Sequence, residues 1–138
     1  MACDTEVLTA ILLGHATCVQ RTAASPGREQ AVPVLVIEEM MRGRLHVIRP
    51  AEAGRATVSL ARAYELCEET VRDVRRFPIR SHTPQAEALS QPWRQQGVRL
   101  ATHDLRMAAT CGAHAATLIA RKRRDFERVP GLIVEFWE

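Results

Sequence analysis

The sequence is poor in aromatic residues and contains no long apolar run. Its 138 residues include two tryptophans, one tyrosine and three phenylalanines, and these do not interleave with basic residues. A stacking platform for single-stranded nucleic acid needs such interleaving, so we exclude that mode of binding. No apolar stretch approaches the roughly 20 residues that span a bilayer, and we therefore expect a soluble chain with no membrane partner.

Cysteine pairs and a leader sequence are also missing. Four cysteines are spread along the chain, at Cys3, Cys18, Cys67 and Cys111. None forms a CxxC pair, and the N-terminus does not resemble a secretory signal peptide, so a reducing cytoplasm is the simplest expectation. The spacings His15-x-x-Cys18 and Cys111-x-x-His114 would provide structural zinc only if both pairs met, and buried apolar cysteines are the simpler interpretation.

Length and charge set the remaining bounds. A chain of 138 residues with 46% hydrophobic residues predicts one domain, residues 1–138, with a substantial core. The formal net charge of +3 is only mildly basic. Attraction to nucleic acid must therefore come from local patches of charge.

The first half of the chain predicts alternating strands and helices. The first strand is short because three residues precede Asp4, and the helix that follows Asp4-Thr5 ends at Gly14. Ser25-Pro26-Gly27 is a turn signal. The apolar run 31–37 predicts a buried strand, although its proline favours the beginning or edge of a strand, and Glu38 and Glu39 then begin a helix.

A long amphipathic helix is predicted from about Arg55 to Phe77. Its apolar residues recur at steps of four and three and form one stripe: Leu60, Tyr64, Cys67, Val71 and Val74. We favour a core-facing stripe over a dedicated interaction helix. Residues 77–80 predict a short strand, and Thr83 or Pro84 begins another helix that runs toward Gln96-Gly97.

The stretch 101–137 reads as a helix and strand followed by a second strand. Asp104 opens a helical segment over 105–115, with His103 expected to be exposed before it. An apolar strand at 117–119, a polar turn at 121–125 and a Pro-Gly turn feeding 132–134 follow.

This alternation predicts a central parallel sheet in a three-layer α/β/α sandwich. The carboxyl ends of parallel strands gather at one edge of such a sheet. Acids that are far apart in sequence can therefore converge there: Asp4, Glu39, Asp104 and Asp125.

Five sequence motifs resemble one known family. They are Cys3-Asp-Thr-Glu-Val-Leu, Glu38-Glu-Met-Met-Arg-Gly-Arg-Leu, Asp104-Leu-Arg-Met-Ala-Ala, Ala113-His-Ala-Ala-Thr-Leu-Ile and Arg124-Asp-Phe-Glu-Arg-Val-Pro-Gly-Leu. In these motifs the chain resembles the PIN-domain ribonucleases, and most closely the VapC-type toxins of bacterial toxin–antitoxin pairs. The resemblance covers essentially the whole chain.

The resemblance implies a PIN-like fold and a metal-dependent endoribonuclease. Asp4, Glu39, Asp104 and Asp125 match the four acidic metal-site positions, and Thr5 is expected to hydrogen-bond a ligand carboxylate or a metal-bound water. Mg²⁺ and Mn²⁺ prefer such carboxylate oxygens, and two such ions about 4 Å apart activate water and stabilise charge on the attacking and leaving oxygens. The resemblance further implies a homodimer and a cognate VapB-like antitoxin whose tail blocks the site and docks along helix 55–77.

Three residues depart from the family pattern. Glu6 stands where Asn or Asp is usual, and it either adds a metal ligand or crowds the site. Ala120 and Lys122 replace a common Thr and Asn. The Lys122 ammonium either neutralises part of the acidic set and weakens metal binding, or contacts the scissile phosphate.

The run Arg121, Lys122, Arg123 and Arg124, with Arg128 nearby, has two open interpretations. It is a rim that contacts RNA phosphates, or it is a solvated basic turn.

Two functions follow from these observations. The leading prediction is an endoribonuclease toxin that cuts RNA with the four acids and Mg²⁺ or Mn²⁺. The alternative is a PIN-like protein with an impaired site that binds RNA or an antitoxin without cleavage. The departures at Glu6, Ala120 and Lys122 motivate the alternative.

Overall fold

The computed structural model of the chain describes residues 1–25 and 30–138. Within these two ranges, twelve elements occur in this order: β1 Ala2–Cys3, α1 Thr5–Leu12, α2 Ala16–Ala24, β2 Val32–Pro33, α3 Val34–Glu52, α4 Leu60–Val74, β3 Ile79–Arg80, α5 Pro84–Gln95, α6 Thr102–Ala113, β4 Leu118–Ala120, α7 Arg123–Phe126 and β5 Val134–Phe136. The turn predicted at 25–27 falls largely outside the described residues.

The strands form a small parallel sheet. Strands β1, β4 and β5 pair in the order β1-β4-β5, and β2 pairs with β3. A parallel bridge between Ala2 and Ala31 joins the two parts, so the order across the sheet is β3-β2-β1-β4-β5. The parallel arrangement predicted from the sequence is confirmed. It brings the carboxyl end of β1 next to the carboxyl end of β4.

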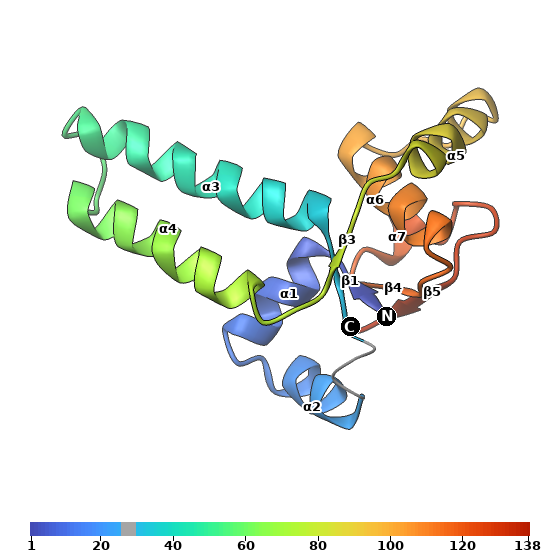
Figure 1. Cartoon of the computed structure of the whole chain (residues 1–138), viewed down its shortest axis with the longest axis horizontal. Helices are drawn as coiled ribbons and strands as arrows, with labels where there is room; N and C mark the ends of the chain where they lie inside the picture. The colour runs from blue at the N-terminus through green and yellow to red at the C-terminus, as the bar shows by residue number, and fades with distance from the viewer. Residues whose placement is uncertain (26–29) are drawn as a thin grey trace.

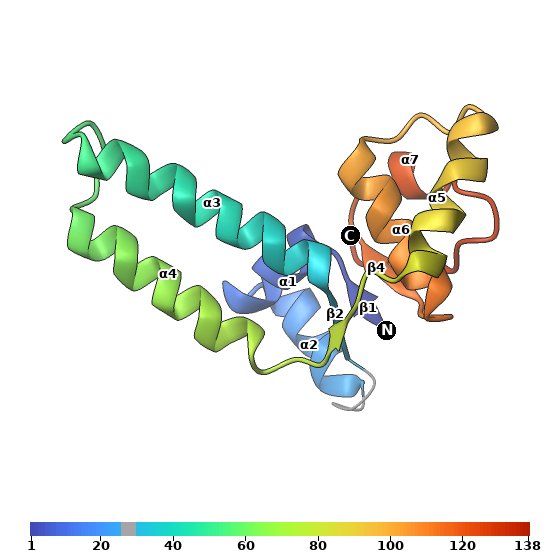
Figure 2. The same cartoon turned by 45° about the horizontal axis from the view of Figure 1, so that its top comes forward.

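Helices cover the sheet on both sides. The pair α1 and α2 lies on one side of the strands and the pair α5 and α6 lies on the other (Figures 1 and 2). Helix α6 supplies much of the core, since six of its residues are buried, including Leu105 and Met107. These side chains join Leu118 and Ile119 of β4 and Phe126 of α7 in one hydrophobic cluster. The three-layer α/β/α sandwich is therefore confirmed.

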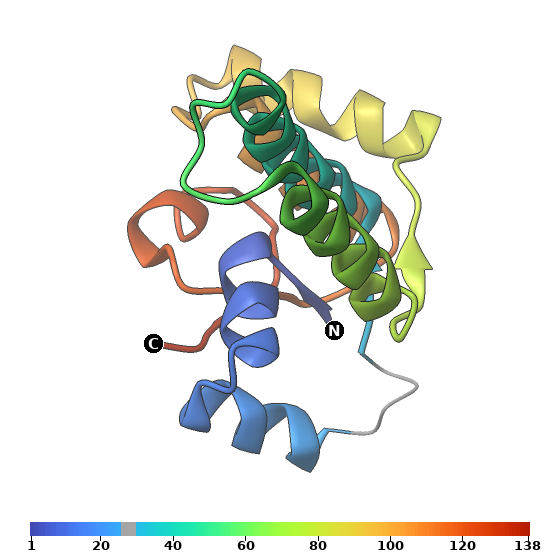
Figure 3. The same cartoon turned by 90° about the vertical axis from the view of Figure 1, so that its left-hand side faces the viewer.

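Helices α3 and α4 form a hairpin that projects beyond the sheet. The two helices lie side by side over most of their length (Figures 1 and 3). Arg44 of α3 donates to the buried Thr70 hydroxyl of α4 at 2.8 Å, and Thr70 donates to the Leu66 carbonyl. The buried hydroxyl therefore both accepts and donates a hydrogen bond, and the bond from Arg44 joins the two helices.

The apolar stripe predicted on the helix 55–77, which corresponds to α4, faces solvent for much of its length. Leu60, Tyr64 and Val71 are 40%, 53% and 39% exposed. The core-facing interpretation is wrong for them, because α4 packs against α3 through smaller side chains such as Ala63 and Thr70. The predicted helix 55–77 is also longer than α4, which begins after the Ser59 cap.

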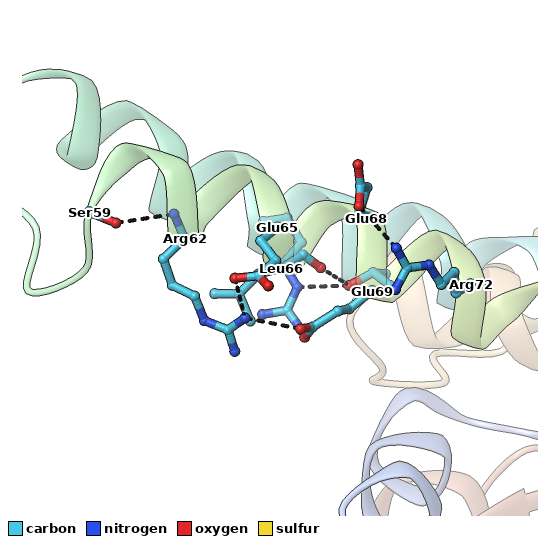
Figure 4. A network of polar contacts seen from close by, with 9 residues as sticks. Ser59, Arg62, Glu65, Leu66, Glu68, Glu69 and Arg72 are labelled. Carbon is cyan, nitrogen blue, oxygen red and sulfur yellow. Dashed lines mark hydrogen bonds and ion pairs between the residues drawn. The ribbon is translucent and has the colours of Figure 1, made fainter.

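Charged side chains line the outer face of α4. Arg62 pairs with Glu65 at 2.8 Å and with Glu69 at 2.9 Å, and Arg72 pairs with Glu68 at 3.1 Å (Figure 4). Such exposed pairs along a helix contribute little to stability, because solvent screens them. They stabilise the helix itself more than its packing.

Three predicted elements need correction. The apolar run 31–37 is mostly helical, because the strand ends at Pro33 and α3 begins at Val34, before Glu38 and Glu39. Proline fixes φ near the value found here, −60°, and ends the ladder, so the chain turns directly into the helix. The polar turn 121–125 contains the short helix α7, and the last strand begins at Val134 and not at 132.

Candidate active site

One cavity of about 540 Å³ opens where α1, α3, α6 and the segment after β4 meet. Three of the four predicted metal-site acids line it, namely Asp4, Glu39 and Asp104, and these three are called the acidic cluster below. Thr5, Glu6, Arg121 and Lys122 line it as well. The convergence expected from the sheet topology is therefore present for residues up to 100 positions apart in the sequence.

Asp4 is the most deeply placed of these acids. It follows β1 directly and caps α1, with its Oδ1 accepting a hydrogen bond from the Val7 N–H at 2.8 Å. Only 3% of the residue is exposed. Burial, and then the charge of Glu6, raises the pKa of Asp4 to about 6, although the Val7 and Arg121 N–H groups and Lys122 oppose the shift. Burial outweighs the hydrogen bond that favours the ionised form.

Glu39 is held by residues from two other helices. The Thr5 hydroxyl at the start of α1 donates a hydrogen bond to Glu39 Oε2. His103 Nδ1 in α6 lies 3.6 Å from the same oxygen, while His103 Nε2 donates to the Leu35 carbonyl at 3.1 Å and lies 3.5 Å from Glu38 Oε2. The expectation that Thr5 contacts a ligand carboxylate agrees with this geometry.

His103 is not the exposed residue that the sequence predicted. Its side chain is 24% exposed and bridges α3 and α6 beside the acidic cluster. In the sequence, only the adjacency of His103 to Asp104 pointed to a role near the site. The contacts of the imidazole with Leu35 and Glu38 depend on where α3 lies in the fold. Glu38, which the sequence analysis did not select, is brought to the same place by this contact.

Asp104 lies in the first turn of α6 and is half-buried. Its pKa is raised by burial and by the charges of Glu39 and Asp125, against the opposing effect of Lys122 and His103. A position near the positive end of the helix dipole predicts a more acidic carboxyl. Desolvation of the Asp104 carboxyl is the largest cause and sets the net direction of the shift.

Lys122 reaches into the acidic cluster from the end of β4. Its Nζ lies 3.7 Å from Glu6 Oε1 and 3.9 Å from Asp104 Oδ2. Burial lowers the pKa of Lys122, but Asp104, Glu6, Asp4 and Glu39 raise it further, so the net shift is upward. Two of the departures from the family pattern, Glu6 and Lys122, therefore form an ion pair with each other. Ala120, the third, is buried in β4.

Asp125 and the rest of the basic run lie farther from the cavity. Asp125, in α7, is not among the cavity residues, but its charge contributes to the raised pKa of Asp104. Arg123 pairs with Glu138 at 2.7 Å and lies over the Phe136 ring at 4.4 Å. Arg121 and Lys122 thus line the cavity, while Arg123 is used in contacts with the C-terminus. Arg124 is exposed.

The side chains that line the cavity suit a hard divalent cation, except that the cation Lys122 lies among them. Carboxylate oxygens and a hydroxyl are the ligands that Mg²⁺ and Mn²⁺ prefer. Within residues 1–25 and 30–138, however, no three His, Cys, Asp or Glu side chains are already gathered closely enough to hold a metal ion. Lys122 provides a positive charge at the place where the carboxylates approach one another. The chemistry of these side chains suits such an ion, and the Lys122 ammonium lies 3.9 Å from Asp104 Oδ2, one of the oxygens that would bind it.

The histidines and cysteines of the zinc alternative lie in separate contacts. Cys18 and Cys111 are fully buried, and burial raises the pKa of Cys111 to about 12. His114 Nε2 donates to the Ser81 carbonyl at 2.8 Å.

In the described part of the chain no helix is long and apolar enough to cross a membrane.

Comparisons with known proteins identify the fold. No protein-family model matches the sequence, and no curated protein matches it in sequence. Solved structures of toxin–antitoxin complexes do match. A chain of VapBC-1 from nontypeable Haemophilus influenzae has a TM-score of 0.76 at 13% identity, covering 99% of this chain and 96% of that one. A chain of DNA-bound VapBC from Salmonella typhimurium has a TM-score of 0.74 at 17% identity, with 99% and 97% covered.

A toxin–antitoxin complex from Klebsiella pneumoniae matches similarly, with a TM-score of 0.70 at 23% identity over 96% of this chain and 94% of that one. The likeness therefore extends over nearly the whole of each chain. At these identities it establishes the fold, which is the PIN-like α/β/α fold that the sequence motifs predicted.

Proposed function

We propose that the protein is a metal-dependent endoribonuclease toxin of the VapC type, which hydrolyses RNA phosphodiester bonds. The observation that carries the proposal is the convergence of Asp4, Glu39 and Asp104 on one open cavity in a chain with this fold. Burial raises the pKa values of Asp4 and Asp104, and raised carboxyl pKa values are common in active sites.

The metal ion in this proposal is Mg²⁺ or Mn²⁺, held by Asp4, Glu39, Asp104 and Asp125. When bound, such an ion makes water a better nucleophile and stabilises negative charge on a phosphate oxygen. The chain itself orients the carboxylates. Asp4 is fixed by the Val7 N–H, and Glu39 is fixed by the Thr5 hydroxyl. Asp125 would complete the set from α7.

The substrate in this proposal is RNA, which approaches the open side of the cavity. Arg121 is exposed at the cavity and is placed to contact a phosphate of the RNA backbone. Lys122, Arg123 and Arg124 belong to the same proposed rim, although Arg123 would have to leave Glu138 to take part. Such contacts bind the backbone without reading sequence, so they imply salt-dependent affinity.

The partners in this proposal are a VapB-like antitoxin and a second copy of the chain. The matching solved structures are named as toxin–antitoxin complexes, some of them bound to DNA. The exposed Leu60, Tyr64 and Val71 of α4 offer apolar area for the antitoxin tail at the position that the resemblance implied. The proposed location of the protein is the cytoplasm.

One observation favours the second candidate, a PIN-like protein that binds RNA or an antitoxin without cleavage. Lys122 lies 3.9 Å from Asp104 Oδ2, an oxygen that the metal ion needs. If Lys122 keeps this position in the presence of metal and RNA, the site binds nucleic acid but does not turn over.

RNA cleavage by the purified protein separates the two candidates. We expect cleavage with Mn²⁺ or Mg²⁺, and its loss with EDTA or with Asp104→Asn. Asp73→Asn is the matched control, because Asp73 near the end of α4 does not line the cavity, and this variant should cleave normally. Tight RNA binding with no cleavage by the folded, antitoxin-free protein would favour the second candidate.

A further inference from the structure

A role in the RNA-contacting rim does not explain why the Lys122 ammonium lies beside the carboxylates of Glu6 and Asp104. Lys122 caps the short helix α7, and β4 carries it to the carboxyl edge of the sheet beside β1. Its side chain is 41% exposed, so a long cation here has open solvent available to it. The ammonium instead lies between the carboxylates of Glu6 and Asp104, within 4 Å of each.

This arrangement neutralises part of a crowded set of negative charges. Asp4, Glu6, Glu39 and Asp104 all act electrostatically on Lys122. Like charges gathered in a partly buried site repel one another, and a counter-cation among them lowers that cost. A divalent ion would do the same, at the same oxygens.

We propose that Lys122 is a tethered counter-cation that occupies the Asp104 side of the acidic cluster and competes with the divalent ion, so that metal binding requires its side chain to leave. The inference rests on the metal site of the proposed function. It adds that the chain weakens its own metal affinity. The paired residue Glu6 supports it, because its carboxylate lies 3.7 Å from the ammonium that also lies beside Asp104.

The size of the effect follows from charge and distance. An ammonium and a divalent ion that share the Asp104 carboxylate would lie only a few ångströms apart and repel each other strongly, even in a well-solvated site. Removal of the ammonium should therefore tighten metal binding about tenfold or more. A substitution that retains the charge should not.

Mn²⁺ binding measured by calorimetry, without RNA, tests the inference. The variants are Lys122→Met, which removes the charge and keeps most of the apolar stem, and Lys122→Arg, which keeps the charge. Arg121→Met is the matched control, because it removes the same charge one residue earlier. Arg121 is exposed at the cavity, and no ion pair joins it to the acidic cluster within the described residues.

We expect Lys122→Met to bind Mn²⁺ about tenfold or more tightly than the unmodified protein, and Lys122→Arg and Arg121→Met to bind within about twofold to threefold of it. Equal affinity in Lys122→Met and the unmodified protein would overturn the competition and leave the proposed metal site standing. Absence of Mn²⁺ binding in every variant would overturn both. An equal gain in Arg121→Met would also overturn the inference, since it would show only a general effect of net charge.

Discussion

Asp4 provides the sharpest test of how the site is built. The carboxyl is almost completely buried, and its pKa is raised from 3.8 to about 6, chiefly by desolvation. Asp4→Asn removes the charge but keeps a side-chain oxygen that can accept the Val7 N–H, so the cap of α1 is retained. We therefore expect the substitution to stabilise the metal-free protein at neutral pH.

The magnitude follows from proton linkage. A shift of one pKa unit corresponds to about 1.4 kcal/mol, so the shift of Asp4 corresponds to about 3 kcal/mol. The folded-state pKa lies above the unfolded-state value, and the folded protein therefore binds this proton more tightly. The stabilisation that the proton provides is fully present below the unfolded pKa of 3.8 and is lost as pH rises through about 6.

Urea unfolding in EDTA, from about pH 4.5 to about pH 7.5, measures this effect. The quantity of interest is the difference in unfolding free energy between Asp4→Asn and the unmodified protein. That difference should rise in favour of the variant by about 1 to 3 kcal/mol across this range. The remaining acidic and basic side chains are the same in both proteins.

Asp73→Asn is the control, because it makes the same change of side chain at a residue that does not line the cavity. If the difference for Asp4→Asn does not change with pH, or moves against the variant as pH rises, then burial does not raise the pKa of Asp4. Saturating Mn²⁺ should make the unmodified protein more stable than Asp4→Asn at neutral pH. Metal binding stabilises the folded state, and the variant lacks the Asp4 carboxylate that would bind the metal.

The remaining predictions concern the ion pair and the core. A double-mutant cycle on Glu6 and Lys122 in metal-free protein should give a coupling of at most about 1 kcal/mol, because both side chains are nearly half exposed. Native alkylation at neutral pH should modify Cys67 first, as the other three cysteines are buried, and mass spectrometry of the peptides would show it. Leu105→Ala, at a residue 1% exposed, should cost about 2 to 5 kcal/mol in urea unfolding. Tyr64→Ala, at a residue 53% exposed, should change stability by less than about 0.5 kcal/mol.

Local signals in the sequence predicted the elements that carry the site. Asp4 before an apolar periodic segment, with Gly14 after it, predicted α1, and Gly14 has the positive φ of +79° that ends such a helix. Thr83 followed by Pro84 predicted the beginning of α5, and the Thr83 hydroxyl accepts the Ala86 N–H. These signals depend on a few neighbouring residues, so they do not require the tertiary structure.

Signals that depend on what covers a surface failed. A continuous apolar run is compatible with a buried strand or a buried helix turn, and Val34 to Ile37 became the first turn of α3. The stripe on α4 has regular helical spacing, yet Tyr64 faces solvent. Periodicity shows that one side of a helix is apolar, but it does not show whether another element lies against that side.

The candidate site was predictable as a set of residues and not as a geometry. Parallel topology allowed Asp4, Glu39 and Asp104 to converge, and the family resemblance selected them among the acids of the chain. The contacts of His103 and Lys122 depend on where α3 begins and on how far β4 extends, which are tertiary features. Asp125 was expected in the same set, but it lies in α7 and is not among the cavity residues.

The site limits the cost of its own negative charge in two different ways. Burial makes the ionised form of Asp4 costly and raises its pKa, whereas Asp104 keeps a cation, Lys122, beside it. In metal-free protein the two corresponding substitutions should therefore have opposite effects. Asp4→Asn removes a buried charge and raises stability. Lys122→Met removes a compensating charge and lowers stability, by a smaller amount because that side chain is 41% exposed. If both substitutions raised stability, then the burial of each charge, and not the balance between charges, would govern the stability of the site.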